Sequence, residues 1–176
     1  HRVLRDKRGN WWSTIPFPRY EDASAAEQRR LPRALTEQIP QIEAATNFYV
    51  GPHGEEMPAY VERGDRRFPE AKLLHTTTGD AFFDVFTFDF VRGSPEEALR
   101  APGTAVITES AAERYFGRTD VVGEPLTIRR QEEERQVEVT GVIADVPAHS
   151  HFTFDVALHV DRIQNWGAYT YVRLKP

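Results

Sequence analysis

Two histidines separated by one residue, His149 and His151, have the type and spacing of a metal-binding pair. In an extended segment both imidazoles face the same side and could ligate Zn²⁺, with Asp145 or Asp155 as a further ligand. The spacing indicates no additional ligand, and a zinc site needs at least three protein ligands. The pair is therefore a weak metal candidate. Loop histidines that fix the start of the next strand are the favoured interpretation.

Short catalytic motifs are absent from the sequence. There is no G-x-S-x-G nucleophile elbow, no H-E-x-x-H zinc helix and no phosphate loop ending in G-K-[ST]. The chain also has no cysteine, which excludes a thiol nucleophile, a disulfide and a thiolate metal site. We expect no catalytic residue, no cofactor-binding residue and no metal in this domain.

The stretch "GDAFFDVFTFDF" concentrates aromatic side chains. Phe82, Phe83 and Phe86 have the spacing of one helical turn, whereas Phe86, Phe88 and Phe90 alternate as in a strand. Packing in a core is the favoured interpretation. An exposed patch that binds a ligand or a membrane surface is the alternative.

The stretch "VITESAAERYFG" predicts a buried strand that leads directly into a helix. Ile107 lies near the end of the strand, Thr108 can cap the helix, and Ala112 and Phe116 lie on its apolar face. Gly117 supplies the left-handed residue that ends the helix. The sequence therefore predicts a rigid packing unit without a reacting group.

Another helix is predicted nearer the start of the chain. The stretch "SAAE" fits a capping box, Pro32 restarts the helix in a new first turn, and Pro40 ends it. Short strands are expected in "HRVLRD" and within residues 42–78, whereas "NWWSTIPFPRY" is expected to be irregular. The stretch "SPEEALRAPG" is predicted to form a short helix capped by Ser94.

A long β-hairpin is predicted in "GEPLTIRRQEEERQVEVTGVIADVP", where Gly141 marks a bulge or a close approach. Its tip is the charged segment of residues 131–135, and exposed charges of this kind influence encounter with partners. The candidate partner contacts are Glu132, Glu133, Glu134 and Arg135. Further strands are expected in "HFTFDVALHV", with Phe152 and Phe154 on the buried face, and in "WGAYTYVRLKP".

The predicted core draws on each of these units. Its members are Phe82, Phe83, Phe86, Ile107, Ala112, Phe116, Val139, Phe152 and Phe154. With 176 residues, of which 40% are hydrophobic, the chain is long enough to bury such a core. A net charge of −5 with both signs interspersed argues against a nucleic-acid partner.

The hydropathy and the two ends of the sequence indicate whether this stretch spans a membrane and whether it belongs to a longer protein. No apolar run approaches the roughly 18 residues that span a bilayer, so we expect this stretch to be soluble. It begins at His1 without a signal-peptide pattern and stops at Pro176, directly after a strand-like segment. We therefore expect both ends to be cuts in a longer protein.

Four blocks, read in order, resemble a single family. They are "GDAFFDVFTFDFVRGSPEEAL", "AVITESAAERYFGRTDVVGEPLTI", "VEVTGVIADVPAHSHFTFDVAL" and "WGAYTYVRLKP". The family is the periplasmic core domain of MacB-like or FtsX-like ABC transporter permeases. Its motifs are matched by Asp80 with Phe82 and Phe83, and by residues 93–99, 107–117 and 145–152. The likeness covers residues 80–176 and, more weakly, 31–42, and His149 stands where the family often has asparagine.

The resemblance implies a mixed α+β fold with two lobes: a β-α-β-type lobe near the membrane and an inserted, mainly β lobe. The implied boundaries place residues 1–45 in the membrane-proximal lobe and 46–165 in the inserted lobe. Residues 166–176 would form a strand that returns toward the first lobe. The C-terminal return segment of that lobe is expected to lie beyond Pro176.

The resemblance also implies a non-catalytic domain on the periplasmic side of the bacterial cytoplasmic membrane. Such a domain couples ATP-driven motion to efflux, lipoprotein extraction or hydrolase control. The implied partners are the transmembrane part of the same permease, a cytoplasmic ABC ATPase that holds the ATP, a second permease copy, and a periplasmic adaptor or substrate. Two alternatives stay open. A hydrophobic pocket with convergent polar groups would favour a ligand-binding or sensor domain, and a buried residue with a shifted pKa in a cleft would favour a hydrolase.

Overall fold

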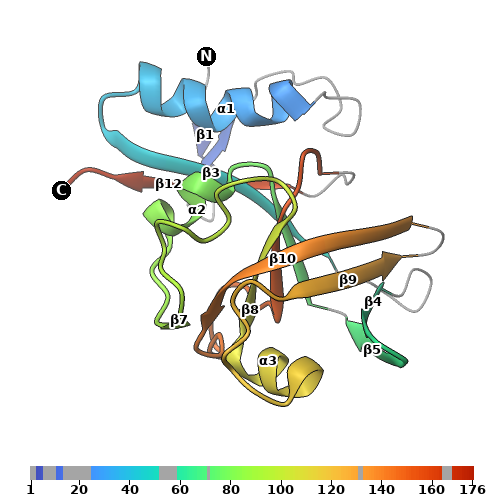
Figure 1. The fold of residues 1–176 in the computed structure, drawn as a ribbon. Helices are drawn as coiled ribbons and strands as arrows, with labels where there is room; N and C mark the ends of the chain where they lie inside the picture. The colour runs from blue at the N-terminus through green and yellow to red at the C-terminus, as the bar shows by residue number, and fades with distance from the viewer. Residues whose placement is uncertain are drawn as a thin grey trace.

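A single large sheet forms the body of the protein, which has a mixed α+β fold (Figure 1). The computed structural model describes residues 3–5, 11–13, 25–51, 59–70, 72–130, 133–163 and 168–176. The helices in these ranges are α1 (Ala25–Gln38), α2 (Gly79–Val85) and α3 (Glu109–Phe116). The strands are β1 (Val3–Arg5), β2 (Trp11–Ser13), β3 (Ile42–Val50), β4 (Ala59–Arg63), β5 (Arg66–Glu70), β6 (Leu73–Thr76), β7 (Phe90–Arg92), β8 (Thr104–Thr108), β9 (Pro125–Arg130), β10 (Glu133–Ile143), β11 (Val156–His159) and β12 (Tyr169–Leu174).

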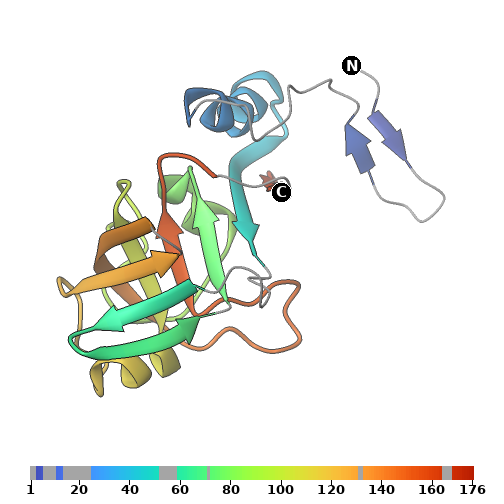
Figure 2. The ribbon, with the colours of Figure 1, turned by 90° about the vertical axis from the view of Figure 1, so that its right-hand side faces the viewer.

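The strand order brings distant parts of the sequence together. The order is β12-β3-β6-β11-β8-β10-β9-β4-β5, and β7 pairs with β10 outside this path. The pairs β6–β11 and β8–β10 are parallel, and the other pairs are antiparallel. Strands β3 and β12 form one end of the sheet, beside α1, whereas α3 lies near β8 (Figures 1 and 2). A separate hairpin joins β1 and β2, although the stretch containing β2 was expected to be irregular.

The predicted strand-to-helix unit is confirmed. Thr108 ends β8, and its hydroxyl accepts a hydrogen bond from the N–H of Ala111 in the first turn of α3 (3.3 Å). At the other end Gly117 has a φ of 71° and donates its N–H to the carbonyl of Glu113. Local capping therefore fixes both ends of α3.

The predicted feature at Gly141 is also confirmed. The register of β10 against β8 shifts between Val139 and Gly141, as at a bulge. A Cβ at Gly141 would lie 2.8 Å from Cε1 of Phe90, so the strand approaches this ring closely. Glycine at this position permits both the bulge in β10 and the close approach of the Phe90 ring.

The short helix expected after β7 is absent, and residues 95–99 form consecutive turns instead. The N–H groups of Glu97 and Ala98 both bond to the carbonyl of Ser94, at 3.2 and 3.0 Å. Leu99 then adopts a φ of 53°. A left-handed residue cannot continue a right-handed helix, so the turns stop there.

The strand expected in "HFTFDVALHV" is shorter than predicted. β11 contains only Val156–His159, and Phe152 and Phe154 precede it. All four residues are buried because β11 lies between β6 and β8, with a core on each face. The sequence predicted one buried face and one face of polar or small residues, but within β11 both faces are buried, as is typical of a strand in a sheet covered on both faces.

Two apolar cores lie on opposite faces of the sheet. Leu73 of β6 belongs to one core and Leu74 to the other, and Ile107 and Val106 of β8 divide in the same way. The first core packs under α3, and the second is the aromatic cluster under α2. Each face of the central strands is thus covered by its own layer.

Five of the predicted core residues are buried. They are Phe82, Ile107, Ala112, Val139 and Phe154. The other four pack against the cores but stay partly exposed. They are Phe83, Phe86, Phe116 and Phe152. Phe116 is the last residue of α3, and its ring lies at the surface beneath the guanidinium of Arg63, 4.7 Å from the ring centroid.

The expected boundary between residues 45 and 46 falls inside β3, which runs without interruption from Ile42 to Val50. Strand β12, in the segment expected to return toward the first lobe, pairs with this same strand. The division into two lobes stays a prediction. Among the described helices, none has the length and hydropathy required to cross a membrane.

Candidate functional site

The two histidines of the weak metal candidate have different surroundings. His149 is exposed, whereas Nε2 of His151 lies 2.6 Å from the hydroxyl of Tyr171. Burial raises the pKa of Tyr171, so this phenol is a neutral hydrogen-bond partner. The carboxylates of Asp145 and Asp155 bind side chains of α3 instead of pointing to a shared ion. The described residues contain no group of three or more acidic or histidine side chains arranged to hold a metal.

Asp145 anchors the start of α3. Its carboxylate accepts hydrogen bonds from the hydroxyl of Ser110 and from the backbone N–H of Ser110, the latter at 3.0 Å. These hydrogen bonds hold the pKa of Asp145 below its ordinary value. The positive end of α3 also favours a carboxylate at this position.

We expect Asp145→Asn to lower the free energy of unfolding by about 1 kcal/mol at neutral pH, because the capping charge is lost while the side-chain shape is kept. The folded pKa of Asp145 is depressed, so its stabilisation is complete above the unfolded value of about 3.9 and disappears as the pH falls through the folded value. Urea denaturation of both proteins at about pH 7 and about pH 3 measures this difference. A difference of equal size at both pH values would contradict the assignment.

The charged end of the β9–β10 hairpin is more ordered than the sequence indicated. β10 begins at Glu133, so three of the four candidate contacts belong to the strand and not to a tip. They are Glu133, Glu134 and Arg135, all exposed, and Glu132 lies outside the described residues. Arg129 of β9 pairs with Glu134 and, at 2.9 Å, with Glu62 of β4, whose pKa it lowers. Contact of this surface with a partner stays a prediction.

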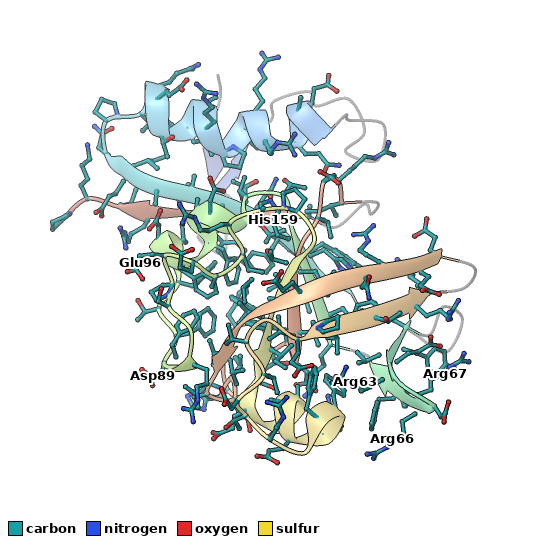
Figure 3. All side chains as sticks on the ribbon, viewed as in Figure 1. Arg63, Arg66, Arg67, Asp89, Glu96 and His159 are labelled. Atoms are coloured by element: carbon teal, nitrogen blue, oxygen red, sulfur yellow. The ribbon has the colours of Figure 1, made fainter. Side chains whose placement is uncertain are left out.

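The neighbouring β4–β5 hairpin carries three arginines, of which Figure 3 shows Arg63 on the side of α3 and Arg67 at the opposite, outer side. Each guanidinium lies over an aromatic ring. The pairs are Arg63 over Phe116, Arg66 over Phe68 and Arg67 over Tyr60, at 4.7, 4.8 and 5.2 Å from the ring centroids. Cation–π contacts of this kind fix the direction of the side chains and cover the rings.

Helix α1 contains a proline in its interior and continues past it. Pro32 has no N–H to donate to the carbonyl of Gln28, one turn earlier. Nδ2 of Asn47, in β3, donates to this carbonyl instead, at 2.9 Å. The expectation that the helix restarts at Pro32 is therefore wrong, because a side chain of the sheet replaces the missing bond. The capping serine expected at Ser24 lies outside the described residues.

The side-chain oxygen of Asn47 binds the threonine run that precedes α2. Oδ1 accepts hydrogen bonds from the N–H of Thr77 (3.2 Å), the hydroxyl of Thr77 (2.9 Å) and the hydroxyl of Thr78 (3.2 Å). The backbone of Asn47 donates to Oγ1 of Thr78 and accepts from Oγ1 of Thr76, at 2.9 and 2.6 Å. All these side chains are buried. One hydrogen-bonded network thus joins α1, β3 and the start of α2.

Gln28 fixes α1 to the sheet at a second point. Its Nε2 donates to the carbonyl of Ile163 and its Oε1 accepts from the N–H of Ile163, both at 2.8 Å. The side chain is only 1% exposed. We call the following residues the α1 junction: Gln28, Asn47, Thr76, Thr77, Thr78 and Ile163. Buried networks with satisfied groups are rigid, so this network fixes the position of α1 on the sheet.

The α1 junction was not predicted from the sequence. The available signals were the polar pair Thr46-Asn47 inside an apolar strand and three consecutive threonines before Gly79. Buried polar residues need partners, so such positions indicate a network. The identity of the partners depends on the folded arrangement and has no local signal.

The start of α2 is also interlocked with β11. Nδ1 of His159 donates to the carbonyl of Leu99 at 2.6 Å, and His159 is 5% exposed (Figure 3). Gly79 begins α2 directly against this contact. A Cβ there would lie 2.8 Å from Nδ1 of His159 and closer still to the backbone of Leu99, so only glycine fits.

A groove of about 810 Å³ lies between α1 and α2. Residues 43–45 of β3 form its floor, arginines of α1 line one wall and carboxylates of α2 line the other. The charged lining residues are Arg29, Arg30, Arg33, Glu37, Glu43, Asp80 and Asp84, of which Glu37 pairs with Arg33 and Glu43 pairs with Arg173. A second cavity of about 60 Å³ lies between the β9–β10 hairpin and the face of β6 and β11.

The comparison of this sequence with protein families decides its membership. Residues 4–176 match the MacB-like periplasmic core domain. The chain belongs to this family. The match spans α1, the α1 junction and every strand of the large sheet, so the residues above belong to one MacB-like periplasmic core domain. No curated protein matches the chain.

Solved structures share the fold of this MacB-like periplasmic core domain. A domain from a Porphyromonas gingivalis protein described as a permease is 26% identical, with a TM-score of 0.62 over 83% of this chain and 62% of that chain. The periplasmic region of MacB from Actinobacillus actinomycetemcomitans is 19% identical, with a TM-score of 0.57 over 84% and 64% of the two chains. The extracellular domain of the noncanonic ABC-type transporter YknZ, from Gram-positive bacteria, is 14% identical, with a TM-score of 0.50 over 80% and 69%. The chain thus spans less than two thirds of the first two structures.

Proposed function

We propose that this MacB-like periplasmic core domain transmits motion in an ABC transporter permease. In this proposal it lies on the extracytoplasmic side of the cytoplasmic membrane, and a cytoplasmic ATPase drives it. The motion is used for export, extraction or other work in the envelope. Membership of the MacB-like family supports this assignment, as do the permease and transporter origins of the similar structures.

The α1 junction is the observation that carries the proposal. A domain that transmits motion must not deform between the point where force enters and the surface where it acts. Asn47 and Gln28 tie α1 to β3 and to Ile163 through buried hydrogen bonds. Displacement of α1 therefore displaces the sheet as one body, and motion takes the form of a rigid-body rotation.

The proposal assigns the chemistry to other parts of the transporter. ATP binds and is hydrolysed in the ATPase, and this domain contributes neither a catalytic residue nor a cofactor site. Its partners are the transmembrane part of the same permease and the ATPase. A second permease copy and a periplasmic adaptor or substrate are the partners expected at its outer surface.

Cross-linking in the full-length permease tests the proposal. The chain has no cysteine, so pairs can be introduced without interference from native thiols in this domain. A short thiol-specific cross-link between an exposed position of this domain and the neighbouring permease part should stop transport while ATP binding is kept. Transport at the normal rate in the locked permease would contradict the proposal and favour a passive binding module.

A matched control keeps the cross-link inside the domain. Arg33 and Glu37 form an exposed i,i+4 pair on α1, so cysteines at these two positions can be bridged without restricting rigid-body motion. We expect this permease to transport normally. Loss of transport in the control would show that the chemistry of cross-linking is itself harmful.

A further inference from the structure

Strand β3 has a neighbour along one edge but lacks one along part of the other. β12 pairs with β3 over residues 42–48, whereas β6 pairs with residues 48–50 only. Among the described residues, no strand pairs with residues 43–46 on the side of β6. This open edge forms the floor of the groove between α1 and α2.

The backbone of Ala45 points toward the open edge. In an antiparallel strand the N–H and C=O of every second residue point to the same side. Asn47 directs both groups away from β12, to Thr78 and Thr76. Ala45 lies two residues earlier and therefore directs its N–H and C=O the same way, into the groove. Ala45 lies opposite Val172 of β12 but directs these two groups away from it, and no hydrogen bond outside the helices and strands of the described residues reaches them; Ala45 is only 4% exposed.

Buried backbone groups in folded proteins nearly always have a hydrogen-bond partner, since each group loses its bond to water on burial. The groove provides both the space and the approach for a further strand. Five of the lining residues are alanines, whose small side chains leave room beside this edge. They are Ala26, Ala34, Ala44, Ala45 and Ala81.

The two walls of the groove differ in the charges that remain outside ion pairs of the described residues, since Arg33 pairs with Glu37 on α1 and Glu43 of the floor pairs with Arg173. Arg30 of α1 is exposed on one wall, and Asp80 and Asp84 of α2 are exposed on the other. Within the described ranges, no ion pair engages any of these three side chains. Helices α1 and α2 lie on opposite sides of β3 (Figure 1), since Asn47 contacts α1 while Phe48 packs on α2.

We propose that the open edge of β3 binds one extended strand of a partner polypeptide. The backbone of this strand pairs with Ala45, as in β-strand addition to a sheet edge. Alternate side chains of a strand point to opposite faces, so one set faces the arginines of α1 and the other faces the carboxylates of α2. The matching segment alternates acidic and basic residues. This binding site goes beyond the transmission of motion, and it is tested on the chain alone.

Backbone hydrogen exchange followed by NMR gives a direct test. In the free chain we expect the N–H of Ala45 to exchange at least about tenfold faster than that of Thr46, which points to β12. The probe is acetyl-Glu-Lys-Glu-Lys-Glu-Lys-amide at millimolar concentration. We expect it to slow the exchange of Ala45 by about tenfold or more. The matched control, acetyl-Glu-Glu-Glu-Lys-Lys-Lys-amide, has the same composition but the wrong alternation and should not protect Ala45.

A single substitution on the α1 wall tests the effect of its charge on peptide binding while the stability of the fold is kept. Arg30→Glu should weaken binding of the alternating peptide by about threefold or more while the urea midpoint of the chain is unchanged, because Arg30 is exposed. Three results would overturn the proposal. They are slow exchange of Ala45 in the free chain, equal protection by the two peptides, and no protection by the alternating peptide.

Discussion

Replacing Asn47 with leucine is expected to lower the free energy of unfolding by about 3–5 kcal/mol, because three buried groups lose their partner together. Leucine keeps the volume but cannot bond the carbonyl of Gln28 or the N–H and hydroxyl of Thr77. Each buried polar group left without a partner costs about 1–3 kcal/mol. Pro32 cannot replace the lost hydrogen bond to the carbonyl of Gln28, since proline has no N–H to donate. Urea denaturation followed by circular dichroism measures the change.

Thr36→Val is the matched control on the same helix. Thr36, about two turns after Gln28 on α1, donates its hydroxyl to the carbonyl of Arg33 and forms no hydrogen bond with the junction residues in the described part of the chain. We expect its effect to stay within about 0.5 kcal/mol, as for most surface substitutions. If Asn47→Leu had no larger effect than Thr36→Val, the α1 junction would not be the element that holds α1 to the sheet.

The second large effect is expected in the aromatic core. Phe82 is completely buried and lies within 6.3 Å, between ring centroids, of five other phenylalanines. Phe82→Ala removes these contacts and leaves a cavity that the surrounding sheet and α2 can fill only in part. We expect a loss of about 3–5 kcal/mol in the free energy of unfolding, measured from urea transitions.

The neighbouring ring provides the control for Phe82. Phe83 lies on the same helix, contacts the same cluster and is partly exposed. Part of its surface stays in water after folding, so Phe83→Ala should cost only about 1–2 kcal/mol. Equal losses of unfolding free energy in the two variants would contradict the assignment of Phe82 to the centre of the cluster and of Phe83 to its margin.

Features with a local cause were predictable from the sequence. Thr108 and Gly117 cap α3 through atoms of the same short segment, so the residue types alone indicate the bonds. Gly141 was identifiable because glycine inside a strand pattern needs a reason, either a bulge or a near neighbour. The phenylalanine cluster was expected to be a core from its density and spacing, although the exposure of each ring depends on what covers it.

Features with remote causes were not predictable. The continuity of α1 depends on Asn47, which supplies the bond that Pro32 removes, and nothing near Pro32 in the sequence indicates it. The turn at Leu99 is held by His159, sixty residues later. β11 was expected to have one face of polar or small residues. Its central place in the sheet, with a core on each side, follows from strand order and not from its own residues, so the burial of both faces was not predictable.

The pairing of β3 with β12 has a consequence for how the chain folds. The two strands are neighbours in space but are separated by most of the described sequence, so their contacts have a high sequence separation. Such contacts form slowly, since a long loop must close before they stabilise anything. During synthesis β3 emerges long before β12, and until β12 follows, both edges of its first half lack a strand. An apolar strand with unpaired edges is a template for association with other chains. Newly made copies are therefore most prone to aggregation in this interval. A chaperone that covers β3 until β12 is made would prevent this association.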